Sequence, residues 1–303
     1  TAPPRAPRPQ RRGGPPPTRD AVVLPRAGAP GRDVGLVLVP GIGIDSRAYL
    51  PLLDALRRAA GAAGLRLFAG CAHFEWGSGC TLSELTVPDG LSLRIEGVVG
   101  AMRARGLPAG SPVFHGAHSL STAFLQDCLA QGRETSGQIL MGGCLLRKHC
   151  YPWFSYKVPT LTVCGDLDGT EPIMRQAEQH RIQSSLDQTR FPVVVLEGQT
   201  HMQFASGPAP RDLREELPPF ATDEAAHAAT AELLVDFMRA RLGLPGAGGV
   251  LGARLRSTQA RLAPLFVSLG MEQRAGGGVA PAGPSADLSA RLSAASGSDF
   301  RND

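Results

Sequence analysis

Three side chains of the kinds used in nucleophilic catalysis follow one another along the chain, in the order Ser119, Asp168 and His201. A serine hydroxyl attacks a carbonyl only when a base takes its proton, and the base needs a carboxylate to orient it. The small residues Ala117 and Ser121 flank Ser119 two positions away on either side. A sharp strand–turn–helix around a nucleophile requires such neighbours, usually Gly. Taken alone, the pattern is equally typical of an exposed serine in an ordinary connection.

Two acidic residues could supply the carboxylate. Asp166 and Asp168 follow an apolar segment at 161–164 that is typical of a buried strand. Functional groups in open α/β sheets gather at the carboxyl ends of the strands. We assign the role to Asp168, which lies past the strand end where the chain bends back over the sheet, and interpret Asp166 as a loop cap. The alternative is that both acids only form the turn.

His201 is the candidate base, because it follows the last apolar segment, 191–196, at the same predicted edge of the sheet. His118 is adjacent to Ser119, so its side chain should point into the sheet as a packing residue. His115 lies within a predicted strand. Structural or solvated roles are expected for the histidines on predicted loops and helix surfaces, which are His73, His149, His180 and His227. The order Ser, Asp, His matches that of α/β-hydrolases and differs from those of chymotrypsin and subtilisin.

Acyl transfer also needs N–H donors for the developing oxyanion. The backbone N–H of Leu120, at the predicted helix start, is one candidate. The Gly-rich loop 40–44 offers a second, the N–H of Ile42, and Gly41 beside it is expected to contact the substrate. The alternative for this loop is a plain tight turn.

The elements that must position these groups alternate between strand and helix patterns. Continuous apolar runs such as 34–39 are typical of parallel strands buried on both faces. Alternation of this kind predicts an α/β fold with a mostly parallel central sheet and helices on both faces. The predicted strands are 34–39, 65–68, 113–115, 138–141, 161–164 and 191–196, and the predicted helices are one capped by Asp45 or Ser46, then 91–105, 122–129, 173–186 and 222–242, with 71–86 irregular.

The connection after Met141 concentrates aromatic residues in a chain where they make up only 5%. We hypothesise that it forms a short lid walling an apolar substrate pocket, with Trp153 and Phe154 contacting the substrate. The alternative is a loop that folds its aromatics into the core. The large apolar side chains of this connection are Leu145, Leu146, Tyr151, Trp153, Phe154 and Tyr156.

Composition divides the chain into three parts. Residues 1–20 form a basic arm, whose first 18 residues contain Pro and Arg but no acid. Such a segment is typical of a disordered arm and equally of a transit-peptide remnant. Residues 21–270 are expected to form one hydrolase domain, and residues 271–303 a disordered Gly/Ala/Ser tail.

Several function classes are disfavoured. The net charge of +4 is small, and the arginines are not clustered with aromatics, so no nucleic-acid partner is expected. No apolar run reaches the about 20 residues of a membrane span, which is consistent with a soluble protein or one in peripheral contact with a membrane. The six cysteines include no C-x-x-C pair, so a zinc ribbon or a thioredoxin motif is not expected. Cys128 and Cys164 fall on core elements, whereas Cys71, Cys80, Cys144 and Cys150 fall on predicted loops where disulfides are conceivable.

Taken together, the loop at Pro40, the segment 116–121, Asp168 and His201 resemble those of α/β-hydrolase serine hydrolases over residues 34–242. Pro40 stands where related enzymes carry His before the glycine. More narrowly, 116–121, 201–207 and the acid-rich segment 215–228 are similar to algal chlorophyllase-like proteins. Plant chlorophyllases differ at the elbow, where they carry Gly-His-Ser-Arg-Gly-Gly.

The narrower resemblance implies hydrolysis of the phytyl ester of chlorophyll or pheophytin, in the chloroplast, without a metal cofactor. Two alternatives remain open for the same residues. One is a lipase, esterase or thioesterase with the same triad. The other is a non-catalytic protein of hydrolase fold that binds an apolar ligand.

Overall fold

The computed structural model describes residues 21–25, 28–74, 80–87, 89–150, 156–183, 186–210, 213 and 217–268. The predicted basic arm (1–20) and the predicted tail (271–303) lie outside this range. The described residues up to Leu265 form one compact unit, and a second unit begins at Phe266, of which only residues 266–268 are described.

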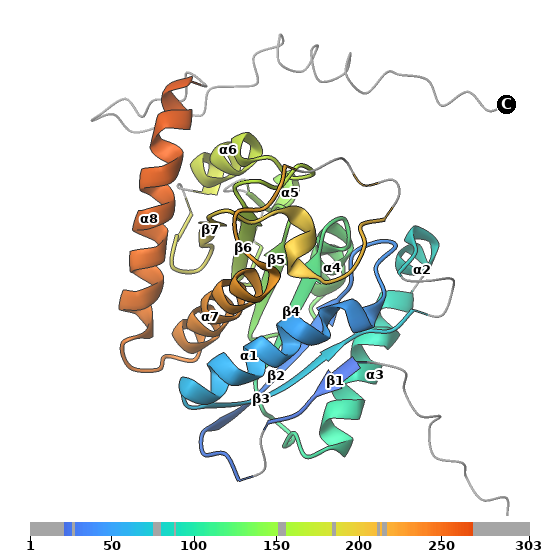
Figure 1. The fold of residues 1–303 in the computed structure, drawn as a ribbon. Coiled ribbons are helices and arrows are strands. Elements are labelled where there is room, and N and C mark those ends of the chain that lie inside the picture. Colours follow the sequence, from blue (N-terminus) through green and yellow to red (C-terminus); the bar gives the residue numbers. More distant parts are fainter. Residues whose placement is uncertain are drawn as a thin grey trace, which may run out of the picture. The chain divides into compact units, whose positions relative to one another are not determined.

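A seven-stranded sheet forms the centre of the compact unit, with the order β1-β3-β2-β4-β5-β6-β7 (Figure 1). Every neighbouring pair is parallel except β1 with β3, which is antiparallel. The predicted α/β architecture with a mostly parallel sheet is therefore confirmed. The strands are β1 (Ala21–Val23), β2 (Arg32–Val39), β3 (Leu65–Cys71), β4 (Val113–His118), β5 (Gly137–Met141), β6 (Thr160–Gly165) and β7 (Val193–Leu196).

Helices cover both faces of this sheet. The two short 3₁₀ helices are η1 (Ser46–Tyr49), which Asp45 caps through the N–H of Arg47, and η2 (His201–Phe204). The α-helices are α1 (Leu50–Ala62), α2 (Leu82–Thr86), α3 (Gly90–Ala104), α4 (Ser121–Ala130), α5 (Arg147–Cys150), α6 (Ile173–Gln183), α7 (Asp223–Arg241) and α8 (Ala247–Ser268).

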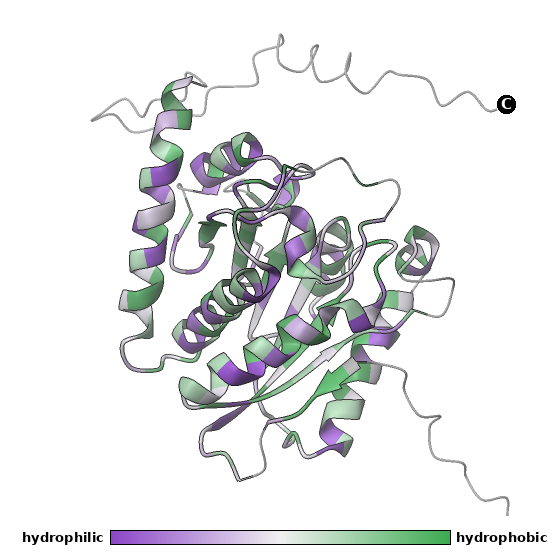
Figure 2. Ribbon diagram, in the orientation of Figure 1, coloured by the Kyte–Doolittle hydropathy of each residue, from purple (hydrophilic) through white to green (hydrophobic). Residues whose placement is uncertain are grey.

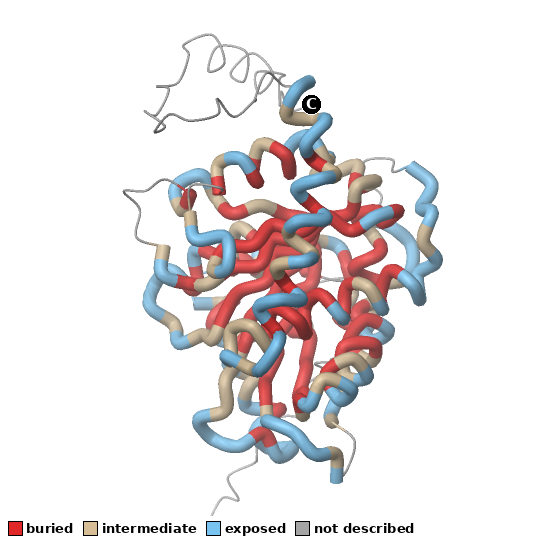
Figure 3. Tube along the Cα trace, turned by 90° about the vertical axis from the view of Figure 1, so that its left-hand side faces the viewer, coloured by how far each residue is buried: buried red, intermediate tan, exposed pale blue. Residues whose placement is uncertain are grey.

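Strand β2 shows why both faces must be covered, because its side chains alternate between two apolar layers. Leu36 and Leu38 pack in the layer formed with α1 and α7, whereas Val37 and Val39 pack in the layer formed with α3 and α4. The strands are accordingly mostly apolar in Figure 2 and mostly buried in Figure 3, while the helices keep a polar, exposed outer side. The sheet is thereby fixed as a rigid base for the loops at its carboxyl edge.

The sequence did not predict α8, whose Gly248, Gly249 and Pro264 are poor helix formers. The helix is explained by its packing beside the last strand of the sheet. Thr258 is buried, and its hydroxyl oxygen accepts a hydrogen bond of 3.1 Å from the N–H of Val195 in β7. An edge strand otherwise exposes such N–H groups, so α8 protects this edge of the sheet.

Smaller elements also differ from prediction. The segment 71–86, expected to be irregular, contains the end of β3 and the helix α2, whose Thr81 and Glu84 form a capping box. Strand β1, three residues long, was missed because its signal is too short. His180 and His227, expected on loops or helix surfaces, are helical but buried.

The cysteines are all free thiols, so the disulfides considered from the sequence do not form. Cys71 ends β3, Cys150 ends α5 and Cys80 pairs with Ile42 in an isolated β-bridge, so these three are buried instead of lying in open loops. Within the described residues, no cluster of His, Cys, Asp or Glu could hold a metal ion. None of the described helices has the length and apolarity needed to cross a membrane.

Candidate active site

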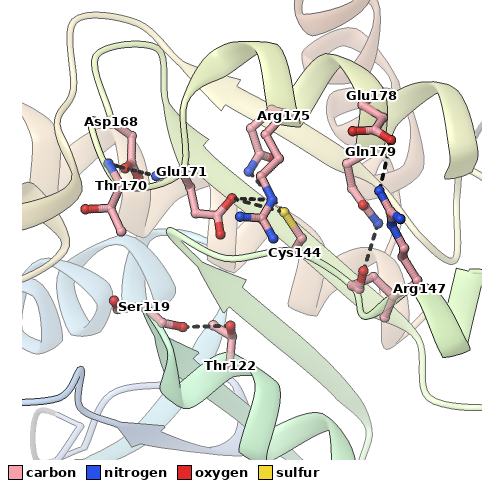
Figure 4. A network of polar contacts seen from close by, with 12 residues as sticks. Ser119, Thr122, Cys144, Arg147, Asp168, Thr170, Glu171, Arg175, Glu178 and Gln179 are labelled. Carbon is pink, nitrogen blue, oxygen red and sulfur yellow. Dashed lines mark hydrogen bonds and ion pairs between the residues drawn. The ribbon is translucent and has the colours of Figure 1, made fainter. Parts of the chain in front are cut away.

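Ser119 occupies the sharp turn between β4 and α4. Its φ angle is 59°, one of only two positive values among the described non-glycine residues. Such a left-handed conformation is unfavourable for serine and persists where the surrounding structure imposes it. The Ser119 N–H donates to the carbonyl of Met141 at 2.8 Å, and its carbonyl accepts from the Thr122 hydroxyl at 2.7 Å (Figure 4). The predicted elbow is therefore held at both of its peptide groups.

The substitution of Ser121 for the usual glycine of the elbow has a structural explanation. The Ser121 side chain is fully buried, and its hydroxyl donates to the carbonyl of Pro40 at 2.7 Å. This hydrogen bond ties the elbow helix to the loop that carries Ile42. Serine at this position thus connects two parts of the predicted site that glycine would leave unlinked.

Asp168 and His201 form a buried pair. Asp168 Oδ2 lies 2.9 Å from His201 Nδ1, and both side chains are wholly shielded from solvent. The other carboxylate oxygen, Oδ1, accepts the N–H groups of Thr170 at 2.9 Å and Glu171 at 2.6 Å. Because a carboxylate only accepts, Nδ1 carries the imidazole proton, and Nε2 is the nitrogen that can accept a proton as a base.

Asp166 has different partners, as its interpretation as a loop cap requires. One of its oxygens accepts the N–H of Gly198 at 2.7 Å, and the other accepts from the Arg261 guanidinium at 2.9 Å. Of the two candidate acids, only Asp168 contacts His201.

Gly142 brings the Asp–His pair next to the elbow. It directly follows Met141, whose carbonyl accepts the Ser119 N–H. A Cβ at Gly142 would lie 2.7 Å from His201 Nδ1 and 3.3 Å from Asp168 Oδ2, so the pair lies directly against this backbone. The φ angle of Gly142 is 56°, which also favours glycine. Sequence reasoning missed Gly142, although the Gly142-Gly143 pair at the end of a strand was a usable signal.

In the loop after β2, the N–H groups around Ile42 are all hydrogen-bonded. The Gly41 N–H donates to Tyr49 Oη at 2.8 Å, the Gly43 N–H to the Cys80 carbonyl at 2.7 Å, and the Ile44 N–H to the Gly41 carbonyl at 3.1 Å. Among the described residues, no acceptor lies on the N–H of Ile42 or on that of Leu120. These are the two groups predicted to bind the oxyanion.

Gly41 lets this loop approach the elbow closely. A Cβ at Gly41 would lie 3.1 Å from His118 Nδ1 and 3.4 Å from Ser119 Cβ. Its N–H is already used by Tyr49, so a contact between Gly41 and substrate would have to involve another atom. The predicted contact with substrate stays a prediction.

His118 is buried, as predicted, but both of its ring nitrogens have polar partners. Nδ1 lies 2.7 Å from Tyr49 Oη, and Nε2 lies 3.1 Å from the carbonyl of His201. The rings of His118 and His201 have centroids 4.6 Å apart. Burial, and next the neighbouring His201, hold the pKa of His118 well below its usual value. Tyr49 was not anticipated as part of the site, because its contact with His118 spans 69 residues.

Glu171 adds a second carboxylate close to Asp168 (Figure 4). Its Oε2 lies 3.3 Å from both the Cys144 thiol, which donates to it, and the Arg175 Nε. Burial, more than any other cause, raises the pKa of Glu171, and the charge of Arg175 opposes this change. The negative charge of Asp168 also raises it, so the two carboxylates interact electrostatically.

The predicted lid is only partly within the described residues. Trp153 and Phe154, expected to contact substrate, lie outside them. Leu145 is buried in a small cluster with Leu140, against which Tyr156 packs. Leu145 and Tyr156 thus pack inward, and both the lid and its alternative stay predictions.

No protein-family model and no curated protein matches the sequence. Among solved structures, the chain is similar to a soluble variant of monoglyceride lipase from Saccharomyces cerevisiae, with 12% identity, a TM-score of 0.49, and coverage of 73% of this chain and 91% of that one. It is also similar to Est1E from Butyrivibrio proteoclasticus, with 11% identity, a TM-score of 0.46, and coverage of 74% and 94%. A third is XC6422 from Xanthomonas campestris, an α/β serine hydrolase without a lid, with 14% identity, a TM-score of 0.41, and coverage of 60% and 79%.

These likenesses concern the fold alone. The strand order and the turn at Ser119 identify the α/β-hydrolase fold independently of them.

Proposed function

We propose that the protein is a serine carboxylic-ester hydrolase acting on an apolar ester. The observation that carries the proposal is the buried Asp168–His201 pair, 2.9 Å apart and placed against Gly142 beside the elbow of Ser119. Ser119 is hydrogen-bonded to Met141 beside Gly142, against which the Asp168–His201 pair packs, and the N–H groups of Ile42 and Leu120 are candidates for binding an oxyanion.

The arrangement supports a two-step reaction. In the first step Ser119 Oγ attacks the ester carbonyl, and His201 Nε2 takes its proton and then delivers it to the leaving alcohol. Asp168 holds the imidazole through Nδ1 and stabilises its charged form. The N–H groups of Ile42 and Leu120 bind the oxyanion. In the second step His201 takes a proton from water, which attacks the acyl-enzyme, and returns that proton to Ser119 Oγ as the bond to the acyl group breaks and the acid leaves.

Replacement of the nucleophile tests the reaction class. Ser119→Ala should lower the turnover of a soluble ester by several orders of magnitude and abolish labelling by a fluorophosphonate. Ser136→Ala, at the start of β5 and far from the elbow in sequence, is the matched control and should retain both. Near-normal turnover by Ser119→Ala would overturn the proposal. A wild-type protein that does not label would instead indicate a non-catalytic binding protein.

For the substrate, we propose chlorophyll or pheophytin, hydrolysed to the chlorophyllide or pheophorbide and phytol. Support comes from the resemblance of 116–121 and 201–207 to algal chlorophyllase-like proteins. Leu120, next to the nucleophile, is 52% exposed and offers an apolar surface to such an alcohol. A chlorophyll substrate would also place the protein in the chloroplast.

A panel of esters separates this substrate from its rivals. Purified protein is incubated with chlorophyll, a triglyceride and an acyl thioester, with Ser119→Ala as the blank. Release of phytol at a rate above those of the other two products supports the chlorophyllase proposal. Preference for the triglyceride or the thioester would leave the triad assignment intact and replace the substrate by a lipid ester or thioester.

A further inference from the structure

A continuous buried chain of hydrogen bonds joins the loop of Ile42 to the segment of His201. It runs from the Gly41 N–H to Tyr49 Oη at 2.8 Å, from Tyr49 Oη to His118 Nδ1 at 2.7 Å, and from His118 Nε2 to the His201 carbonyl at 3.1 Å. The side chains of Tyr49, His118 and His201 all have 0% exposure. Bulk water therefore does not compete for these hydrogen bonds.

The direction of every bond in this chain is determined by its two ends. A carbonyl only accepts, so His118 Nε2 must carry a proton and donate it to His201. Neutral His118 then has an unprotonated Nδ1, which accepts from the Tyr49 hydroxyl. The Tyr49 oxygen in turn accepts the Gly41 N–H. Each polar atom thus has a partner of the opposite kind, and burial keeps His118 neutral by lowering its pKa.

At one end, the chain fixes the peptide group between Pro40 and Gly41. Its N–H is bound by Tyr49, and its carbonyl accepts the hydroxyl of Ser121 at 2.7 Å. The next peptide group carries the Ile42 N–H, and the one after it is held by the bond from Gly43 to Cys80. The Ile42 N–H therefore lies between the Pro40–Gly41 and Ile42–Gly43 peptide groups, both of which are held by hydrogen bonds.

We propose that Tyr49 and His118 are positioning residues that set the direction of the Ile42 N–H relative to the imidazole of His201. This inference rests on the proposed hydrolase function. Preorganised donors stabilise an oxyanion because they do not have to reorient during the reaction. One buried imidazole contacts both the donor loop and the base segment, so it couples the two groups that must act on the same carbonyl.

Two substitutions break the chain at its centre. Tyr49→Phe removes a single oxygen atom and leaves the Gly41 N–H free to turn. His118→Gln retains an amide donor for the His201 carbonyl but removes the acceptor for Tyr49. The control is His115→Gln, the same replacement of a buried histidine three residues earlier in β4, where Nδ1 contacts the Thr135 hydroxyl.

The measurements are kcat and KM for a soluble p-nitrophenyl ester, well below each variant's melting temperature. We expect Tyr49→Phe and His118→Gln each to lower kcat by about 10- to 100-fold with KM nearly unchanged, somewhat less than the loss of a whole oxyanion donor. The double variant should lose little more than either single one, because both interrupt the same chain. His115→Gln should keep the wild-type kcat.

Folded variants could instead keep a kcat within about twofold of the wild type and show only a lower melting temperature. The chain of hydrogen bonds would then have only a structural role, and the proposal would be overturned. If one variant does not fold, the other decides. If neither folds, the role is structural and the proposal is equally overturned. A wild-type protein that neither turns over the ester nor reacts with a fluorophosphonate contradicts the proposed function itself, which is a different result from active wild type with unaffected variants.

Discussion

Asp166 and Asp168 are two residues apart, yet their carboxylates serve different parts of the molecule. Asp168 pairs with His201, whereas Asp166 joins Gly198 to Arg261. Substituting each by asparagine therefore separates a role in orienting the base from a role in holding the loop.

Asp168→Asn should lower kcat by about 10⁴-fold, because an amide can present an N–H to Nδ1 and favour the wrong tautomer of His201. Asp166→Asn should keep kcat within a fewfold of the wild type and lower the melting temperature, since the Arg261 contact is weakened. Steady-state kinetics and thermal unfolding of both variants check this. The opposite pattern, with Asp166→Asn as the inactive variant, would refute the assignment of Asp168.

Gly142 combines a positive φ with close contact to the Asp–His pair. Gly142→Ala should lower kcat by about 100-fold, because a Cβ 2.7 Å from His201 Nδ1 must displace the ring. Gly243→Ala is the control, since its φ of 67° imposes similar backbone strain but a Cβ there meets nothing within 4 Å. Both should lose stability, by about 1–2 kcal/mol, and only Gly142→Ala should lose turnover. Equal kinetics in the two variants would show that the ring has room to move.

At the scale of single elements, α8 covers the outer edge of β7, the last strand of the sheet. Thr258→Val keeps the side-chain shape but removes the acceptor of the Val195 N–H, and the buried N–H left without a partner should cost about 1–3 kcal/mol. The exposed neighbour Ser257 gives the control Ser257→Ala, expected to change stability by less than about 0.5 kcal/mol. Urea unfolding of both variants measures the difference. Indistinguishable unfolding midpoints would mean that α8 does not stabilise the edge through Thr258.

The elements and residues that the sequence predicted are those with a local signal. Each of these signals can be seen within a short stretch of sequence. They are the apolar run at β2, the small residues around Ser119, the acids after β6 and the histidine after β7. The choice of Asp168 over Asp166 also followed from local position relative to a strand end.

The parts that sequence reasoning missed depend on tertiary contacts. Tyr49 has the pattern of an ordinary apolar helix residue, and only the tertiary contact between the end of η1 and the end of β4 brings its hydroxyl to His118. Helix α8 has weak intrinsic propensity and is stabilised by its contact with β7. Neither the role of Tyr49 nor the formation of α8 can be predicted without knowing where residues distant in the sequence lie.

For the molecule as a whole, burial of titratable groups predicts how stability depends on pH. Burial lowers the pKa of His115 to about 4, and is the first cause of the lowered pKa of His118, His180 and His227. In the unfolded chain each would bind a proton below about pH 6.5. Stability should therefore be greatest above this pH and fall as the pH is lowered from about 6.5 toward 4.

Glu171 acts in the opposite sense, because its raised pKa favours the folded state at low pH. It is one group against five histidines, because burial is also the first cause of the lowered pKa of His149. Melting temperatures measured from pH 8 to pH 4.5 should show the decrease, and His115→Gln should make it shallower by removing one of the five groups. A melting temperature that is constant between pH 7 and pH 5 would contradict this prediction.

The position of α8 at the end of the described chain has a consequence for synthesis. Strands β1–β7 all precede it, so the ribosome releases β7 before the helix that supplies Thr258 has been translated. A nascent chain arrested before residue 247 would present an uncovered strand to other polypeptides, and should be retained by chaperones or aggregate, whereas a chain from which residues 247–268 have also emerged closes that strand itself.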